Sequence, residues 1–225
     1  PETWVTEDSD LFSFVEGDDE TVKLNKVHLA LVKELQTGDH ARVAISRKLA
    51  RLANFEKIDD YDIPKDFNGE LRSYQKAGYQ WMKFLDEYSF GGCLADDMGL
   101  GKTLQALAIL LDRAKLGPSL VIAPTSVCFN WQQEAIKFAP SLNIKVFANA
   151  TSQQDRIDLL ESLTQYDCVV ISYGLLQREI DLLAKVNWNT LIADEAQALK
   201  NPLAKRTKAA YKLKAQFKII TTGTP

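Results

Sequence analysis

Short continuous apolar runs alternate with amphipathic stretches from residue 71 to residue 225. The apolar runs are too short for typical helices and are rich in Val and Ile, so they predict strands. They lie at 91–95, 119–124, 144–148, 168–173, 190–195 and 218–223. Helical periodicity lies between them at 103–115, 127–138, 153–164, 174–185 and 203–214. This alternation predicts an α/β fold with a mostly parallel sheet flanked by helices.

The first 65 residues have a different pattern and predict a small, mainly helical extension. Helical periodicity occurs at 24–36 and 41–56. The segment DDYDIPKDFNG, residues 59–69, is acidic and contains proline and glycine, which is typical of a linker. We therefore divide the chain into an N-terminal extension at 1–65 and a main domain at 66–225, and we expect any protein partners to bind the extension.

The composition is that of a globular protein, with 225 residues, 46% hydrophobic and 25% charged. No apolar run reaches the roughly 20 residues that span a bilayer, and the three scattered cysteines favour neither a disulfide framework nor a zinc cluster. We expect no membrane partner. We expect a cytoplasmic location, associated with the nucleoid, if the organism is a prokaryote, and a nuclear location if it is a eukaryote. Residues 71–225 carry 18 basic and 14 acidic side chains, so this part tolerates a polyanionic partner.

The segment LADDMGLGKT follows the first predicted strand and precedes a predicted helix. Gly101, Lys102 and Thr103 match the end of a phosphate-binding loop, whose general pattern is Gly, four residues, then Gly-Lys-Ser/Thr. In such a loop the lysine reaches the β- and γ-phosphates and the hydroxyl binds Mg²⁺. The first glycine of the pattern is replaced by Asp96, which precedes Asp97. An ordinary glycine-rich turn is the alternative interpretation.

The segment LIADEAQALKN ends an apolar strand with two carboxylates, Asp194 and Glu195. An acidic pair at this place typically accompanies a phosphate-binding loop. Asp194 would then help to hold Mg²⁺, and Glu195 would orient or deprotonate the attacking water. A surface acidic pair without function is the alternative. Because ligands bind at the carboxyl ends of parallel strands, we expect the loop, this pair and the final segment TTGTP at one edge of the sheet.

The segment LRSYQKAGYQWM predicts an amphipathic helix before the loop. Gln75 has both a donor and an acceptor, which suits the edge of an adenine. The alternative is a plain packing helix whose inward face carries Leu71, Tyr74, Gly78 and Trp81.

Two further strand ends carry small polar residues that can contact a nucleic-acid backbone. These residues are Thr125, Ser126 and Ser172. Trp131 has helical spacing from Val127 and Ala135 and is expected in the core rather than on a base.

Residues 198–218 contain seven cations and no acid. Lys205, Lys208 and Lys212 share one face of the predicted helix. A solvated face is the ordinary interpretation of such a run, and phosphate contact is the alternative.

Together these motifs resemble those of the Swi/Snf-type (sucrose-nonfermenting family) DNA-translocating ATPases of helicase superfamily two. The family's loop typically reads Ala-Asp-acidic-Met-Gly-Leu-Gly-Lys-Thr, so Asp96 and Asp97 fit it. LRSYQKAGYQWM resembles the adenine-sensing segment, and VIAPTSVCFNWQQEAIKF resembles the next motif. DEAQALKN resembles the Asp-Glu-Ala-His-x-x-Lys-Asn box, with Gln197 in place of His, as in the bacterial and archaeal branch. The resemblance covers residues 71–225.

The resemblance implies a RecA-like P-loop NTPase lobe that binds ATP and Mg²⁺ and acts on double-stranded DNA with a second RecA-like lobe. Its nucleotide-binding residues would be Gln75, Asp97, Met98, Gly99, Leu100, Gly101, Lys102, Thr103 and Leu104. Its catalytic residues would be Lys102 and Glu195, and its metal ligands Thr103 and Asp194. Its nucleic-acid contacts would be Thr125, Ser126, Ser172, Lys200 and Asn201.

Two other functions remain as alternatives at this stage. One is a superfamily-two helicase that acts on RNA, against which the loop sequence and Gln197 argue. The other is a nucleotide-binding interaction module, in which the acidic extension matters more than hydrolysis. The intact set Lys102, Thr103, Asp194 and Glu195 argues against a dead site.

Overall fold

Six strands form one sheet in which every neighbouring pair is parallel, as the alternating pattern predicts. The computed structural model places them in the order β1-β6-β5-β2-β4-β3. Their bounds are Gly92–Ala95 for β1, Ser119–Ala123 for β2, Asn143–Val146 for β3, Asp167–Ser172 for β4, Trp188–Ala193 for β5 and Ala215–Thr222 for β6. Each of the six predicted runs forms a strand.

The structure describes residues 58, 60–88, 90–95, 101–199 and 204–223. The predicted helices of the extension, the loop residues Asp97, Met98, Gly99 and Leu100, and the candidate contacts Lys200 and Asn201 lie outside these ranges. Within the described part of the chain, no helix is both long enough and apolar enough to cross a membrane.

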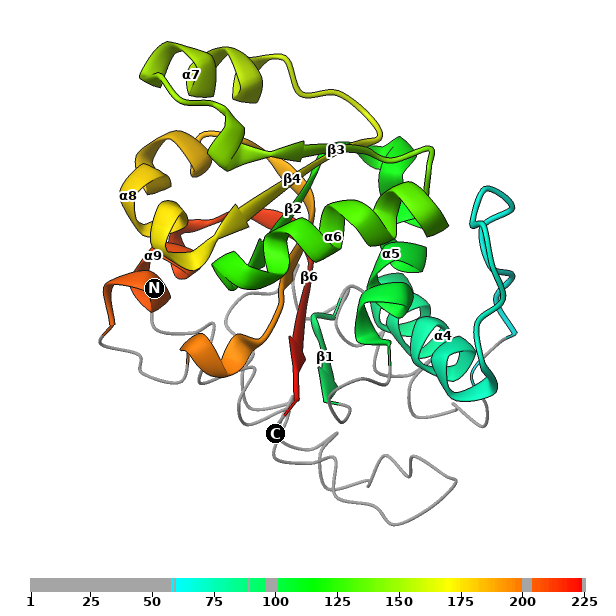
Figure 1. Ribbon diagram of the computed structural model, residues 1–225. Coiled ribbons are helices and arrows are strands. Elements are labelled where there is room, and N and C mark those ends of the chain that lie inside the picture. The colour runs from blue at the N-terminus through cyan, green and yellow to red at the C-terminus, as the bar shows by residue number, and fades with distance from the viewer. Residues whose placement is uncertain (1–57, 59, 89, 96–100, 200–203, 224–225) are drawn as a thin grey trace, which may run out of the picture. The chain divides into compact units, whose positions relative to one another are not determined.

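The helices cover both faces of the sheet (Figure 1). They are α4 Ser73–Glu87, α5 Lys102–Arg113, α6 Thr125–Phe138, α7 Gln153–Glu161, α8 Tyr173–Leu183 and α9 Lys205–Lys212. Short 3₁₀ helices are also present, namely η1 Ala114–Leu116, η2 Phe147–Asn149 and η3 Ala196–Leu199. Helices α4, α5 and α6 lie on one side, and α8 and α9 on the other. Because both faces are covered, the central strands β2 and β5 are buried along their whole length.

Helix α4 buries only part of the face that the packing interpretation names, in which Gly78 faces Gln105 of α5. Tyr74 is exposed, and Leu71, Gly78 and Trp81 are only half-buried. The buried side chains are Gln75, Tyr79, Met82, Phe84 and Leu85. The neighbours decide this face, because α5 packs along one flank of α4 and the segment before α4 covers another.

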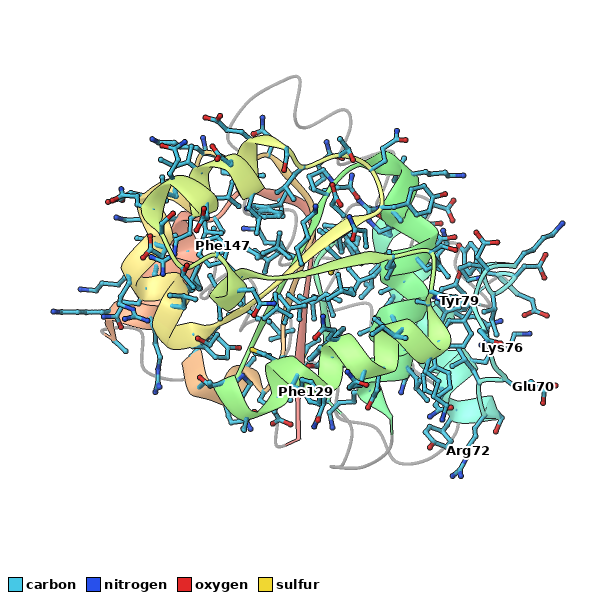
Figure 2. All side chains as sticks on the ribbon, turned by 45° about the horizontal axis from the view of Figure 1, so that its top comes forward. Glu70, Arg72, Lys76, Tyr79, Phe129 and Phe147 are labelled. Atoms are coloured by element: carbon cyan, nitrogen blue, oxygen red, sulfur yellow. The ribbon has the colours of Figure 1, made fainter. Side chains whose placement is uncertain are left out.

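The segment of residues 60–69 is a strap that lies against α4 and α6, although its composition predicts a linker. Its Asp62 carbonyl accepts a 3.0 Å hydrogen bond from the Tyr79 hydroxyl, and Asp60 pairs with Lys76 at 2.8 Å. Figure 2 shows Lys76 and Tyr79 beside this part of the chain. At its other end the backbone N–H of Asn68 donates to the Phe138 carbonyl at 2.7 Å. The strap therefore fixes the helix that carries Gln75.

Helix α5 begins from a backbone conformation that favours glycine. Gly101 has φ +75° and ψ +40°, in the left-handed region. A Cβ atom at this position would lie 2.4 Å from Nε2 of Gln75. The absence of a side chain thus allows the amide of α4 to lie against the start of α5.

We predict that Gly101→Ala lowers the free energy of unfolding by about 1–2 kcal/mol, because an L-residue pays that cost in the left-handed region. Gly174→Ala is the matched control, because an added Cβ on α8 meets nothing within 4 Å. The control should stabilise the protein by about 0.4–1 kcal/mol through the unfolded state. Urea unfolding of both variants measures the difference, and equal effects of the two changes would contradict the assignment.

Candidate functional site

The described parts of the three segments expected at one edge of the sheet do lie there, because β6 lies between β1 and β5. Ala95 at the end of β1 pairs with Thr222 of β6. Ala193 at the end of β5 pairs with Ile220 of the same strand. Neighbouring strands lie about 4.8 Å apart, so the ends of β1 and β5 are roughly 10 Å from each other. A group as large as a triphosphate can therefore touch the loops that follow both strands.

Lys102 and Thr103 are the first residues of α5, the helix that follows β1. Lys102 is 8% exposed, and Thr103 and Leu104 are half-buried. The carbonyl of Gly101 accepts hydrogen bonds from the N–H groups of Leu104 and Gln105. Lys102 is therefore part of a helix N-terminus, whose partial positive charge favours an anion.

Gln75 lies on α4 with its amide directed at the start of α5. It is 5% exposed, and its Oε1 accepts a 2.9 Å hydrogen bond from the backbone N–H of Arg72. Its Nε2 faces the backbone of Gly101. The structure therefore brings Gln75 next to the described end of the phosphate-binding loop, although the two are 26 residues apart in sequence.

The Asp194 carboxylate is the best-connected polar group of the site. It is 6% exposed. Its Oδ2 accepts a 2.9 Å hydrogen bond from the indole N–H of Trp131. Its Oδ1 accepts from the hydroxyl of Thr221 on β6 and, at 3.0 Å, from the backbone N–H of Glu195. These three donors hold the carboxylate in one orientation.

Glu195 follows Asp194 in a left-handed backbone conformation, with φ +52°. A non-glycine residue pays about 1–3 kcal/mol for such a conformation, and strain of this kind clusters at functional sites. Its carboxylate accepts a hydrogen bond from the side-chain amide of Gln197. Gln197 in turn accepts a 3.0 Å hydrogen bond from the hydroxyl of Thr222. The acidic segment is thereby joined to the end of β6.

The ionisable groups around Asp194 report a negative local field. Burial, followed by the charges of Asp194 and Glu195, raises the pKa of the Tyr173 hydroxyl, which donates a 2.7 Å hydrogen bond to the Asp194 carbonyl. Burial and then Asp194 likewise raise the pKa of Glu134. Such a field favours binding of a cation.

The described candidate nucleic-acid residues, Thr125, Ser126 and Ser172, lie at the same edge, at the ends of β2 and β4. Thr125 and Ser172 line one pocket of about 230 Å³, together with Cys128 and Phe129. Phe129, on α6 in Figure 2, is 64% exposed. Ser126 is exposed beside Thr125. The Ser172 side chain also caps α8, where it accepts from the N–H of Leu175 at 3.3 Å.

Sequence reasoning missed two members of the site. Trp131 is fully buried, as expected of a core residue, but it also donates to Asp194. Thr221 donates to the same carboxylate from the neighbouring strand. The alternation of apolar and polar residues along β6 places Thr221 at a buried position. The sequence pattern does not show, however, that β6 pairs with β5.

Comparisons with known proteins agree with this geometry. Residues 74–225 match the family model of the SNF2-related domain. The chain is 41% identical over 181 residues to the putative ATP-dependent helicase/translocase YwqA of Bacillus subtilis, covering 79% of this chain and 20% of that protein. It is 35% identical over 192 residues to human TATA-binding protein-associated factor 172, covering 79% of this chain and 10% of that protein.

Solved structures give the same result. The chain superposes with a TM-score of 0.65 and 42% identity on the SWI2/SNF2 ATPase core of Sulfolobus solfataricus in complex with dsDNA. The match covers 76% of this chain and 35% of that one. The sequence expectation of a RecA-like Swi/Snf-type lobe is thus confirmed, and the chain belongs to the SNF2-related domain family.

Proposed function

We propose that this chain is the ATP-binding lobe of a double-stranded-DNA-dependent ATPase and translocase. The observation that carries the proposal is the meeting of the Lys102 helix start with the Asp194–Glu195 segment at one sheet edge. Family membership supports it. The chain spans only about a fifth of the Bacillus relative's length. The proposed activity would need a second RecA-like lobe besides this chain.

The phosphates of ATP would bind at the N-terminus of α5. Lys102 supplies a positive charge for the β- and γ-phosphates, and the loop from Asp97 to Leu104 supplies backbone donors. Gln75 would bind the adenine edge, because its amide is already held next to Gly101. Lys102 carries the catalytic part of this role, since charge on the transferred phosphoryl group must be neutralised.

Thr103 and Asp194 would hold Mg²⁺. One hydroxyl and one carboxylate are the hard oxygen ligands that this ion prefers, and Mg²⁺ usually takes its remaining ligands from water and from substrate phosphates. The donors on Asp194 keep its carboxylate in one orientation. When bound, the ion would neutralise charge on the phosphates.

Glu195 would orient the attacking water and accept its proton. Its carboxylate is held by Gln197, which is in turn bonded to Thr222. The strained backbone at Glu195 fixes the direction in which the side chain leaves the strand.

Double-stranded DNA would bind along the edge formed by Thr125, Ser126 and Ser172, and Lys200 and Asn201 would also contact it. The exposed hydroxyl side chains at the start of α6 can donate to phosphate oxygens without reading sequence. The Sulfolobus relative was solved with dsDNA. The N-terminal extension would contact protein partners, and the protein would act in the cytoplasm or nucleus, wherever its DNA lies.

We predict that the intact protein hydrolyses ATP faster with duplex DNA and that Glu195→Gln abolishes this turnover. The substitution is nearly isosteric but removes the general base, so the rate should fall about a hundredfold or more while ATP binding is kept. Steady-state hydrolysis with duplex DNA, single-stranded RNA or no nucleic acid tests both points. Stimulation by RNA and not by duplex DNA would favour an RNA-acting helicase, and no hydrolysis under any condition would favour an interaction module.

We also predict that duplex DNA protects Cys128 from alkylation, because Cys128 lines the same pocket as Thr125 and Ser172. Burial raises the pKa of this thiol, so the reaction should speed up as the pH rises. Peptide mass spectrometry at pH 8.5 measures the rate. Cys168 is fully buried, with a pKa raised to about 12, and serves as the unreactive internal control. Equal labelling of Cys128 with and without DNA would remove this pocket from the DNA path.

A further inference from the structure

We infer that Trp131 is a positioning residue for the magnesium-binding carboxylate of Asp194. The inference rests on the proposed function, which makes Asp194 a metal ligand. It goes beyond that function because Trp131 otherwise reads as an ordinary core side chain. The indole N–H donates to Oδ2 of Asp194 at 2.9 Å, and the ring is fully buried.

The two oxygens of Asp194 are held from different elements. Oδ1 accepts from Thr221 on β6 and from the backbone N–H of Glu195. Among the described residues, Trp131 on α6 is the donor on Oδ2. A turn about the Cβ–Cγ bond moves both oxygens, so with Trp131 it must break the bonds on Oδ1 and on Oδ2, and without Trp131 only those on Oδ1. Trp131 therefore narrows the range of directions in which Oδ2 points.

The position of the indole is itself set by packing. Helix α6 lies against β4, β3 and α5. On the same face of α6, Ala135 is fully buried one turn after Trp131. A ring confined in this way has no freedom to follow a rotating carboxylate, so the N–H acts as a fixed donor. Fixed outer donors of this kind typically change metal affinity by about 10- to 100-fold.

A matched control exists in Trp188, at the start of β5. It is 1% exposed, and its indole N–H donates to the Leu183 carbonyl at 3.0 Å. Trp131→Phe and Trp188→Phe therefore each remove one buried indole and one hydrogen bond of similar length. Of these two hydrogen bonds, only the one that Trp131 donates has Asp194 as its acceptor.

The experiment measures Mn²⁺ binding to the intact protein with ADP, by electron paramagnetic resonance of free Mn²⁺. Trp131→Phe should weaken Mn²⁺ binding about 10- to 100-fold. Trp188→Phe should change it roughly twofold or less, within the ordinary effect of a change remote from the ligand. ADP binding in EDTA should be the same in both variants, since the indole acts on the metal ligand and not on the nucleotide.

Two further arms make every outcome decisive. Site-specific replacement of Trp131 by 3-benzothienylalanine keeps the ring and exchanges the N–H for sulfur, so it tests the donor even if Trp131→Phe fails to fold. Unchanged Mn²⁺ affinity in this variant would overturn the inference. Asp194→Asn tests the underlying function, because Mn²⁺ affinity that survives this change would show that Asp194 is not a ligand. A loss with Asp194→Asn and none with the Trp131 variants would sink the inference alone.

Discussion

The common direction of the six strands is the constraint on which the site depends. Parallel strands need a crossover after each strand, and the crossovers place all carboxyl ends at one edge. Ala95, Ala193 and Thr222 come from distant parts of the chain and lie within three neighbouring strands because of it. The same constraint buries β2 and β5 on both faces, so the residues that follow these two strands extend from a rigid support. A catalytic group on such a support keeps its geometry without help from the ligand.

Hydrogen bonds of Asp194 join the sheet to a helix on each of its two faces. Its side chain is bonded to α6 and β6, its carbonyl to the Tyr173 hydroxyl of α8, and its N–H to the carbonyl of Ile122 on β2. Each of these bonds satisfies a buried polar group that would otherwise be costly. The carboxylate that we propose as a magnesium ligand is thus also bound into the fold.

Most of the fold and the polar ends of the strands follow from the sequence, because period and composition are local properties. The Gly-Lys-Thr motif and the Asp-Glu pair are local as well. What the sequence does not carry is which surfaces meet. The inward face of α4 depends on α5 and on the strap, so the packing interpretation names Tyr74, which is exposed, and leaves out Tyr79 and Met82, which are buried. The hydrogen bond from Trp131 to Asp194 joins residues 63 positions apart. The sequence pattern does not show that a side chain of α6 reaches the residue that follows β5.

The place of β1 in the sheet has a consequence for local opening of the molecule. Within the described residues β1 is an outer strand, held through four residue pairs to β6, whereas β5 lies between two strands. Outer strands open at lower free energy than central ones. The strand that precedes α5 is therefore easier to detach than β5, the strand that precedes the acidic pair. A nucleotide that touches both the start of α5 and the acidic pair would stabilise the pairing of β1 with β6 by mass action. Occupancy of the site and order at this edge of the sheet would therefore rise together.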